Sequence, residues 1–206
     1  VTDKRGNLNI EGIKFFATGI SDTNKDLKFE ATTNENGVAM FDNIIIGKYV
    51  ITEDGSTVPT AYLVADSKQV TVEYNETAEV AFENIEKTGE IKVTKTTVGN
   101  INVSGITFNL RGTSDSGRDI DIPAVTDENG VAIFSEIPIG TYTIYEDEKT
   151  VPTAYLVADP QNVTVTYAET KEVPIENKEK TGSITVHKTT EGQKNIEGIK
   201  FYLRGT

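Results

Sequence analysis

The stretch Thr-Val-Pro-Thr-Ala-Tyr-Leu-Val-Ala-Asp occupies residues 57–66 and occurs again without change at residues 150–159. The same offset of 93 residues relates Glu53 to Glu146, so no insertion or deletion separates the two copies. Self-similarity at a fixed period indicates a tandem array in which one structural unit is repeated. We therefore expect three segments, which are residues 1–88, residues 89–181 and the opening strands of a third copy at residues 182–206.

Composition limits what such an array can be. A copy of about 90 residues lies in the size range of single domains and can bury a modest core. The net charge of -12 is spread over both long copies, which argues against nucleic acid and anionic membrane as partners. No apolar run is long enough to span a bilayer and no leader of basic and apolar residues begins the sequence, so targeting or anchoring segments are expected outside it.

Cysteine is absent from the sequence. This excludes disulfides and thiolate metal sites. Small extracellular β domains usually need such a cross-link, because their cores are too small to stabilise them alone. We therefore expect another means of stabilisation.

The local pattern of both copies is typical of β-strands. Short runs rich in β-branched and aromatic residues alternate between apolar and polar side chains, and turn residues such as Asp-Glu-Asn-Gly at 127–130 separate them. In the second copy these runs are residues 91–95, 106–110, 131–134, 141–146, 162–167 and 171–176. Their spacing predicts an all-β fold of tandem immunoglobulin-like β-sandwich modules, each with about six or seven antiparallel strands. Short linkers at 86–89 and 179–182 predict an elongated rod.

Three polar residues of the second copy lie in phase with the predicted core. Alternate side chains of a strand share one face, so Lys95, Glu146 and Asn177 point the same way as the apolar residues that precede them. The inward-facing sets are residues 91, 93 and 95, residues 142, 144 and 146, and residues 173, 175 and 177. Buried lysine, glutamate and asparagine are each costly unless they find partners. We therefore expect these three, from the first, a middle and the last strand, to meet in one site.

A structural interpretation of the same residues is also open. A polar residue at the end of an inward-facing set often marks only the place where the strand leaves the core, and a lysine there can extend its ammonium group to water. Repetition does not exclude this interpretation, because duplication copies neutral residues too. Their coincidence on three strands nevertheless favours one site over three separate strand ends.

The other copies contain parts of the same set. Glu53 and Asn84 occupy the equivalent positions in the first copy, but Thr2 stands at the lysine position and Lys4 lies two residues further on. The simplest explanation is that the first copy lacks most of its first strand, which would make it the weaker module. In the third copy the lysine position is Lys188.

These segments resemble the Cna B-type domains of Gram-positive surface adhesins and pilins. Residues 89–95 and 182–188 are similar to the family's opening strand with its reactive lysine. Further similar segments follow in the family's order, at residues 105–110, 129–134, 140–146 and 175–177. The resemblance covers the full chain. The family's glutamate is usually followed by Pro-x-Gly-Tyr, whereas Ala154 replaces that glycine here, a loop variation with little bearing on the site.

The resemblance implies an intramolecular isopeptide bond between Lys95 and Asn177, with Glu146 assisting. Burial favours the neutral amine and the protonated acid that the reaction requires. The amine attacks the side-chain amide carbon, the acid hydrogen-bonds the carbonyl oxygen, and ammonia leaves. Glu53 would assist in the same way at Asn84 if a lysine reached it. This single-turnover reaction modifies only the chain itself, so we expect a protein that is not an enzyme and needs no cofactor or metal.

The resemblance also implies a role and a location. It implies a structural stalk or pilus-shaft segment at the bacterial cell surface, extracellular and anchored to the cell wall through segments outside this chain. The partners would be adjacent modules of the same chain. An alternative is an adhesin module that recognises host extracellular matrix through its loops. Residues 19–26 and 112–119 remain similar between the copies, which suits a spacer better than two distinct binding faces.

A head-to-tail association of molecules is a further hypothesis. Residues 183–188 of one molecule would complete the first module of another by strand addition. Lys188 would then face Asn84, and the contact would generate a non-closing fibre.

Other polar and aromatic residues carry weaker signals. His187, the only histidine, is expected on the opposite face of its strand from Lys188, which gives no support to a catalytic triad or a histidine metal cluster. The aspartates at positions 22, 26, 115, 119 and 121 do not match a calcium-binding loop and are expected in ordinary acidic turns. Tyr62 and Tyr155 are expected to pack at a sheet corner.

Overall fold

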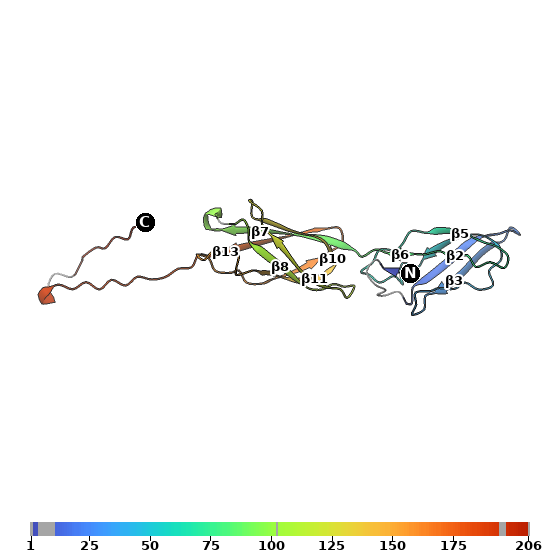
Figure 1. The fold of residues 1–206 in the computed structure, drawn as a ribbon, viewed down its shortest axis with the longest axis horizontal. Coiled ribbons are helices and arrows are strands. Elements are labelled where there is room, and N and C mark those ends of the chain that lie inside the picture. Colours follow the sequence, from blue (N-terminus) through green and yellow to red (C-terminus); the bar gives the residue numbers. More distant parts are fainter. Residues whose placement is uncertain (1, 4–10, 102, 194–196, 206) are drawn as a thin grey trace.

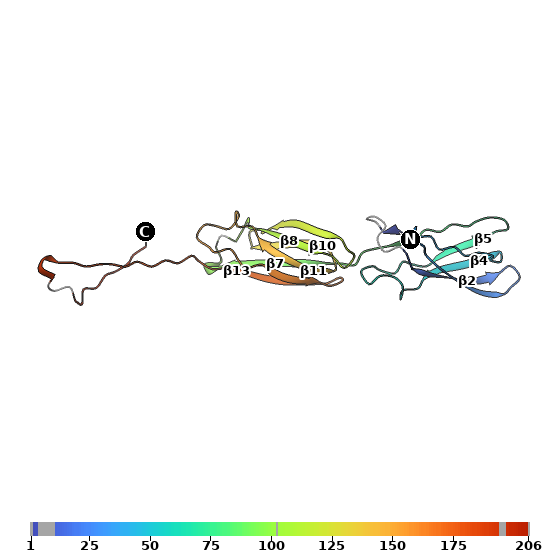
Figure 2. The ribbon, with the colours of Figure 1, turned by 90° about the horizontal axis from the view of Figure 1, so that it is seen from below.

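The computed structural model describes residues 2–3, 11–101, 103–193 and 197–205. Figure 1 shows two β-rich modules in line along the long axis of the molecule, the first in blue to cyan and the second in green to orange. An extended C-terminal segment follows the second module. Figure 2 shows the same linear arrangement from a perpendicular direction. The molecule is therefore elongated, as the short linkers predict.

The first module is built around one four-stranded antiparallel sheet. Its strands are β2 (Lys14–Ser21), β3 (Asp26–Thr32), β4 (Gly47–Glu53) and β5 (Lys68–Val72), in the spatial order β3-β2-β4-β5. A separate pair consists of β1 (Thr2–Asp3) and β6 (Glu83–Asn84), which run parallel. Both pieces belong to one module because Phe82, next to β6, packs in the same core as β2 and β4.

The second module has seven strands in two sheets. Their spatial orders are β12-β11-β8-β9 and β10-β7-β13. The strands are β7 (Thr88–Thr97), β8 (Thr107–Thr113), β9 (Asp119–Val125), β10 (Val131–Pro138), β11 (Gly140–Glu146), β12 (Gln161–Val165) and β13 (Thr170–Asn177). The helices of the described residues are two short 3-10 turns, η1 (Val98–Asn100) and η2 (Glu191–Gln193). The predicted all-β sandwich class is confirmed.

The pairing of the first and last strands differs from the antiparallel expectation. β7 and β13 run parallel, from Thr170 opposite Glu90 to Asn177 opposite Thr97. Parallel neighbours need a long connection, and here the whole module connects them. An alternating pattern specifies which face a strand buries but not its direction, so the sequence could not distinguish the two arrangements.

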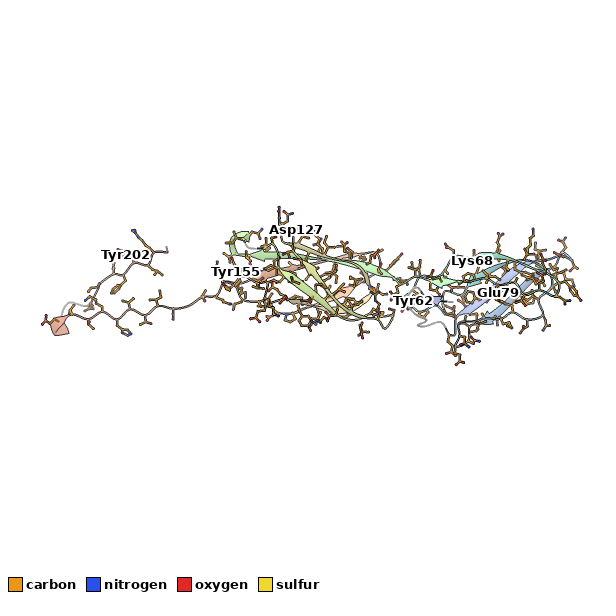
Figure 3. The ribbon with its side chains drawn as sticks, in the orientation of Figure 1. Tyr62, Lys68, Glu79, Asp127, Tyr155 and Tyr202 are labelled. Carbon is orange, nitrogen blue, oxygen red and sulfur yellow. The ribbon has the colours of Figure 1, made fainter. Side chains whose placement is uncertain are left out.

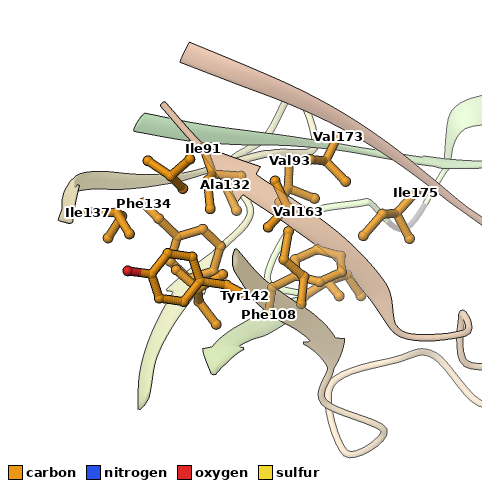
Figure 4. Close-up of a cluster of buried hydrophobic side chains, with 14 of the residues drawn as sticks. Ile91, Val93, Phe108, Ala132, Phe134, Ile137, Tyr142, Val163, Val173 and Ile175 are labelled. Atoms are coloured by element: carbon orange, nitrogen blue, oxygen red, sulfur yellow. The ribbon is translucent and has the colours of Figure 1, made fainter. Parts of the chain in front are cut away.

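The core of the second module lies between its two sheets, as Figure 4 shows. On β7 buried side chains alternate with partly exposed ones, and Ile91 and Val93 are fully buried. Phe108 and Tyr142 pack in the same cluster, and the Tyr142 hydroxyl donates a hydrogen bond to the Pro138 carbonyl oxygen (2.7 Å). Each large apolar side chain buried in this way contributes about 1.5–3 kcal/mol. The core therefore provides a rigid frame for the polar residues at the strand ends.

The junction between the modules is part of the fold and not a free linker. Thr88 and Gly89, predicted as linker, already belong to β7. A Cβ added at Gly89 would lie 2.3 Å from a backbone oxygen of the turn between β12 and β13. The second module therefore begins directly at the end of the first.

The chain after β13 forms no strand in its described residues. Ile184 and Val186, which the alternating pattern places on an inward face, are 72% and 54% exposed because no second sheet packs against them. The opening of a third module within residues 182–206 stays a prediction. Within the described residues, no helix has the length and apolar character that crossing a membrane requires.

Candidate cross-linking site

Lys95 lies on β7, the central strand of its sheet, and is only 1% exposed. Its backbone N–H donates to the Gly130 carbonyl oxygen (2.7 Å), and its Nζ donates to the Thr96 carbonyl oxygen (2.5 Å). Burial lowers the pKa of Lys95, while the carboxylates of Glu146 and Glu176 act in the opposite direction. A lowered pKa increases the fraction of neutral amine, which is the nucleophilic form.

Asn177 is the last residue of β13 and is also 1% exposed. Its Nδ2 donates to Glu146 Oε2 (2.7 Å) and to the Leu156 carbonyl oxygen (2.5 Å). Because a carbonyl oxygen can only accept a hydrogen bond, the contact with Leu156 determines which side of the amide carries the nitrogen. The other amide atom, Oδ1, is buried and has no hydrogen-bond partner within the described chain.

Glu146 is the last residue of β11, on the facing sheet, and is partly buried. Its Oε2 accepts from Asn177 Nδ2 and from the Ala158 backbone N–H (2.8 Å). Its Oε1 is buried and, among the described residues, has no partner. Buried polar atoms without a partner are rare in native proteins. Glu146 Oε1 and Asn177 Oδ1 are therefore two acceptors that an acid proton or a lysine N–H could satisfy.

Lys95, Glu146 and Asn177 lie on three strands that belong to both sheets, at one end of the core. Asn177 and Glu146 are hydrogen-bonded, and the charge of Glu146 acts on the pKa of Lys95. On the neighbouring parallel strands, Lys95 lies opposite Ile175 and Asn177 lies opposite Thr97. The lysine and the amide are therefore offset by one inward-facing position, which a lysine side chain is long enough to cross.

The first module contains the same glutamate–asparagine pair. Asn84 Nδ2 donates to Glu53 Oε2 (2.8 Å) and to the Leu63 carbonyl oxygen (2.9 Å). The Ala65 backbone N–H donates to the same Oε2 (2.7 Å). Glu53 Oε1 and Asn84 Oδ1 are buried and without partners in the part of the chain that the structure describes. Two copies of the fold thus build the acid–amide half of the site in the same way.

The described residues bring no lysine to this first pair. Asp3 of β1 is the register partner of Asn84, and Lys4 lies outside the described residues. Lys188 is exposed, on the C-terminal segment that extends from the far end of the second module (Figure 1). Its predicted position opposite Asn84 of another molecule stays a prediction.

Sequence reasoning missed the backbone groups that hold the pair. The Leu156 carbonyl and the Ala158 N–H both belong to the repeated stretch at residues 150–159, and their counterparts Leu63 and Ala65 make the same contacts in the first module. The unchanged repetition of this stretch was the signal that could have found them. A loop that must present a carbonyl and an N–H at fixed positions tolerates few changes of backbone conformation.

The remaining candidate residues lie apart from this site. His187 is exposed. Asp119 accepts from the Thr113 hydroxyl (2.8 Å), and Asp121 pairs with Arg111 (3.1 Å) on the neighbouring strand. In the described ranges, no group of three or more histidines or acids could hold a metal ion.

Comparison with known proteins identifies the family of the two modules. The model of the SpaA domain, described as a prealbumin-like fold domain, matches residues 1–86 and again residues 89–179. The chain belongs to the SpaA prealbumin-like domain family. It is similar in structure to the Bacillus anthracis TIE protein, with 25% identity and a TM-score of 0.63 over 86% of this chain and 32% of that one. The chain thus spans about a third of the length of that relative.

Two pilins of known structure show weaker similarity to this chain. GBS52, the minor pilin of the Gram-positive pathogen Streptococcus agalactiae, is 20% identical over 91% of each chain, with a TM-score of 0.43. The shaft pilin SpaA of Lactobacillus rhamnosus GG is 14% identical over 85% of this chain and 87% of that chain, with a TM-score of 0.37. The comparison with curated proteins finds no match. The family match thus gives both modules the prealbumin-like fold.

Proposed function

We propose that this chain is a segment of the stalk or shaft of a Gram-positive surface protein, and that a Lys95–Asn177 isopeptide bond of the Cna B type stabilises its second module. One observation carries the proposal. A lysine that is 1% exposed lies on the strand beside an equally buried asparagine amide, and that amide is hydrogen-bonded to a carboxyl group. Such groups are costly to bury unless they react or are fully paired.

The reaction balances without a cofactor. The neutral Nζ of Lys95 attacks Cγ of Asn177, a new C–N bond forms, and the bond from Cγ to Nδ2 breaks. Glu146 removes a proton from the attacking nitrogen and delivers a proton to Nδ2, which leaves as ammonia. The product is a secondary amide, and the chain loses about 17 Da.

The position of Glu146 refines its proposed role. The sequence interpretation placed the acid on the carbonyl oxygen of the amide, whereas the hydrogen bond runs from Nδ2 to Glu146 Oε2. A carboxyl group at that nitrogen can deliver the proton with which Nδ2 leaves as ammonia. General acid–base assistance of this kind is worth about 10²–10⁴ in rate.

The mechanical consequence follows from the parallel pairing of β7 and β13. Tension along a row of modules enters the second module at Thr88 and leaves at Asn177. With Lys95 joined to Asn177, the force passes through β7 and the new bond, and residues 96–176 carry none of it. The bond also closes a loop that is worth about 4–5 kcal/mol in the chain-entropy model.

Intact-mass spectrometry with peptide mapping tests this proposal. We expect the wild-type chain to be about 17 Da lighter than its sequence, with one cross-linked peptide that contains Lys95 and Asn177. Lys95→Met should have the full mass, and Glu146→Gln should form the bond about 10²–10⁴-fold more slowly. Glu53→Gln, the matched change in the first module, should retain the wild-type loss. Recovery of free wild-type peptides with Lys95 and Asn177 unmodified would refute the bond.

A further inference from the structure

The end of the first module is held by the second module through one carboxylate. Glu86 lies in the three-residue segment between β6 and β7, and its side chain is only 11% exposed. Its Oε1 accepts a hydrogen bond from the Ser116 hydroxyl (2.5 Å), and its Oε2 pairs with the Arg118 guanidinium (3.3 Å). Ser116 and Arg118 both belong to the turn between β8 and β9 of the second module.

The turn that receives Glu86 is held together by hydrogen bonds of its own. The Ser114 hydroxyl hydrogen-bonds the Ser116 hydroxyl (2.8 Å) and accepts from the Arg118 backbone N–H (3.0 Å). Gly117 adopts a positive φ of 85°, which closes the turn. Ser114 and Ser116 are each 5% exposed. The Ser116 hydroxyl and the Arg118 guanidinium therefore both contact one carboxylate that is 11% exposed, although the Arg118 side chain is 37% exposed. Hydrogen bonds to a charged group of this kind are stronger than those between neutral groups.

The next residue, Lys87, is hydrogen-bonded to both modules. The Lys87 N–H donates to the Ala61 carbonyl oxygen of the first module (2.8 Å), and the Lys87 carbonyl oxygen accepts from the Ile139 N–H of the second (3.0 Å). Lys87 Nζ donates to the Thr60 carbonyl oxygen (2.9 Å). The junction is thus bonded to both modules within two residues.

The same receiving turn exists in the first module, where nothing in the described chain covers it. The Ser21 hydroxyl hydrogen-bonds the Thr23 hydroxyl (3.0 Å) and accepts from the Lys25 N–H (3.1 Å), as in the second module. Thr23 and Lys25 are exposed, whereas their counterparts Ser116 and Arg118 are buried and half-buried, respectively. The two turns therefore differ in whether a glutamate lies on them and not in how they are built.

The matching glutamate also repeats. Glu86 bridges to Tyr62, and Glu179 bridges to Tyr155 in the same antiparallel way. Figure 3 shows Tyr62 at the junction of the modules and Tyr155 at the opposite end of the second module. Glu179 is exposed. Each module thus presents a glutamate at one end and a hydroxyl-and-cation turn at the other.

We propose that these two features form a repeating lock, in which the terminal glutamate of one SpaA module binds the Ser/Thr-x-Arg/Lys turn of the next. Glu86 and the turn Ser114–Arg118 are the closed lock within this chain. The turn Ser21–Lys25 is a docking site for the terminal glutamate of another module of the same kind, and Glu179 is the group that docks. The lock determines how successive modules are oriented along the rod, and it does not depend on the isopeptide bond.

Limited trypsin digestion of the full chain tests the closed lock. Cleavage after Lys87 requires the junction to open, so Glu86→Gln should accelerate it about tenfold, the factor commonly lost with a hydrogen bond to a charged group. Arg118→Met should do the same. Glu179→Gln is the matched control, because its exposed side chain should leave the cleavage after Lys180 unchanged. Unaltered cleavage after Lys87 in both junction variants would overturn the lock.

Residual dipolar couplings give the orientation directly. Both modules of the wild-type chain should fit one alignment tensor, and Glu86→Gln should require two. The intact mass of Glu86→Gln should still be about 17 Da low, because Lys95, Glu146 and Asn177 are untouched. A full-mass wild-type chain with one tensor would refute the bond and leave the lock standing, whereas a light wild-type chain whose modules need two tensors would do the reverse.

The open docking site is tested by the concentration dependence of amide chemical shifts. A single ion pair between separate molecules is weak, and the tethering within a rod supplies the effective concentration that it lacks. In the wild-type chain we expect the amides of residues 21–25 to shift as the protein concentration approaches the millimolar range. The shifts should be absent in Glu179→Gln. Equal shifts in both proteins, or none in the wild type, would contradict docking at this turn.

Discussion

The two modules share a sequence pattern and a fold but differ in their first strand. β7 of the second module spans ten residues and lies between β10 and β13, whereas the described part of the first module's opening strand is β1 (Thr2–Asp3), which pairs with β6. The counterpart of β10 in the first module, around residues 38–45, forms no strand in the structure. In the second module the first strand is central to the second sheet, because β10 and β13 both pair with it.

Equivalent side chains of the last strand and of the β10 region are less buried in the first module than in the second. Val173 of the last strand is 9% exposed, but its counterpart Val80 is 37% exposed. Phe134 is 2% exposed on β10, while its counterpart Phe41 is only partly buried. In the part of the first module that the structure describes, no long central strand pairs with these segments, so their alternating faces are less completely buried. The first module is therefore expected to be the less stable one.

Removal of the lysine should have the largest effect on this comparison. Lys95→Met keeps an apolar side chain in the core but removes the bond, and it should cost the second module about 4–5 kcal/mol. Its melting temperature should fall by roughly 20–30 °C, towards that of the first module. Differential scanning calorimetry measures both transitions in one experiment. Lys92→Met, which removes a half-buried lysine of the same strand and its ion pair with Glu172, is the control for the loss of a lysine on β7. An unchanged second transition in Lys95→Met would show that the modules differ for another reason.

A smaller effect is expected from the turn that positions Lys95. Gly130 has a φ of 75°, and a Cβ there would lie 2.6 Å from the Lys95 carbonyl oxygen. Gly105 has a similar φ of 77° with nothing within 4 Å of an added Cβ. Both substitutions by alanine incur the cost of a left-handed residue, about 1 kcal/mol, and Gly130→Ala should cost about 1 kcal/mol more because of the contact. Equal free energies of unfolding in the two variants would exclude a tight approach of this turn to β7.

The smallest effect concerns the charge of Lys95 before any bond forms. Asn177→Ala leaves Lys95 as a free amine, and burial lowers its pKa from the ordinary value of 10.5. The unfolded chain then binds more protons than the folded one between the two pKa values, so the stability of Asn177→Ala should rise as the pH increases towards 10.5. The slope of the free energy of unfolding against pH cannot exceed about 1.4 kcal/mol per pH unit when one proton is involved.

The control for this pH dependence is the double variant Lys95→Met with Asn177→Ala, which lacks the titrating amine. Denaturant unfolding at a series of alkaline pH values compares the two proteins. A pH dependence that is identical in both would mean that the buried amine is charged to the same extent in the folded and unfolded states.

Much of this protein could be predicted from local pattern alone. The constant offset that relates Glu53 to Glu146 indicates two copies of one module. The alternation of side chains along each strand places Lys95, Glu146 and Asn177 on inward faces. The inward faces can be predicted because a strand alternates its side chains between two faces whatever its neighbours are. For the same reason the pattern of residues 183–188 predicts an inward face that remains exposed here, since no second sheet is present to cover it.

Three other features depend on tertiary structure. The direction in which β13 pairs with β7, the Leu156 carbonyl that turns the Asn177 nitrogen towards Glu146, and the contact between Glu86 and Arg118 all join segments that are far apart in the chain. Alternation of side chains is a property of one strand and can be read residue by residue. Strand direction, amide orientation and the docking of one module on the next arise only when separate segments pack together, because each depends on a partner that the local sequence does not contain.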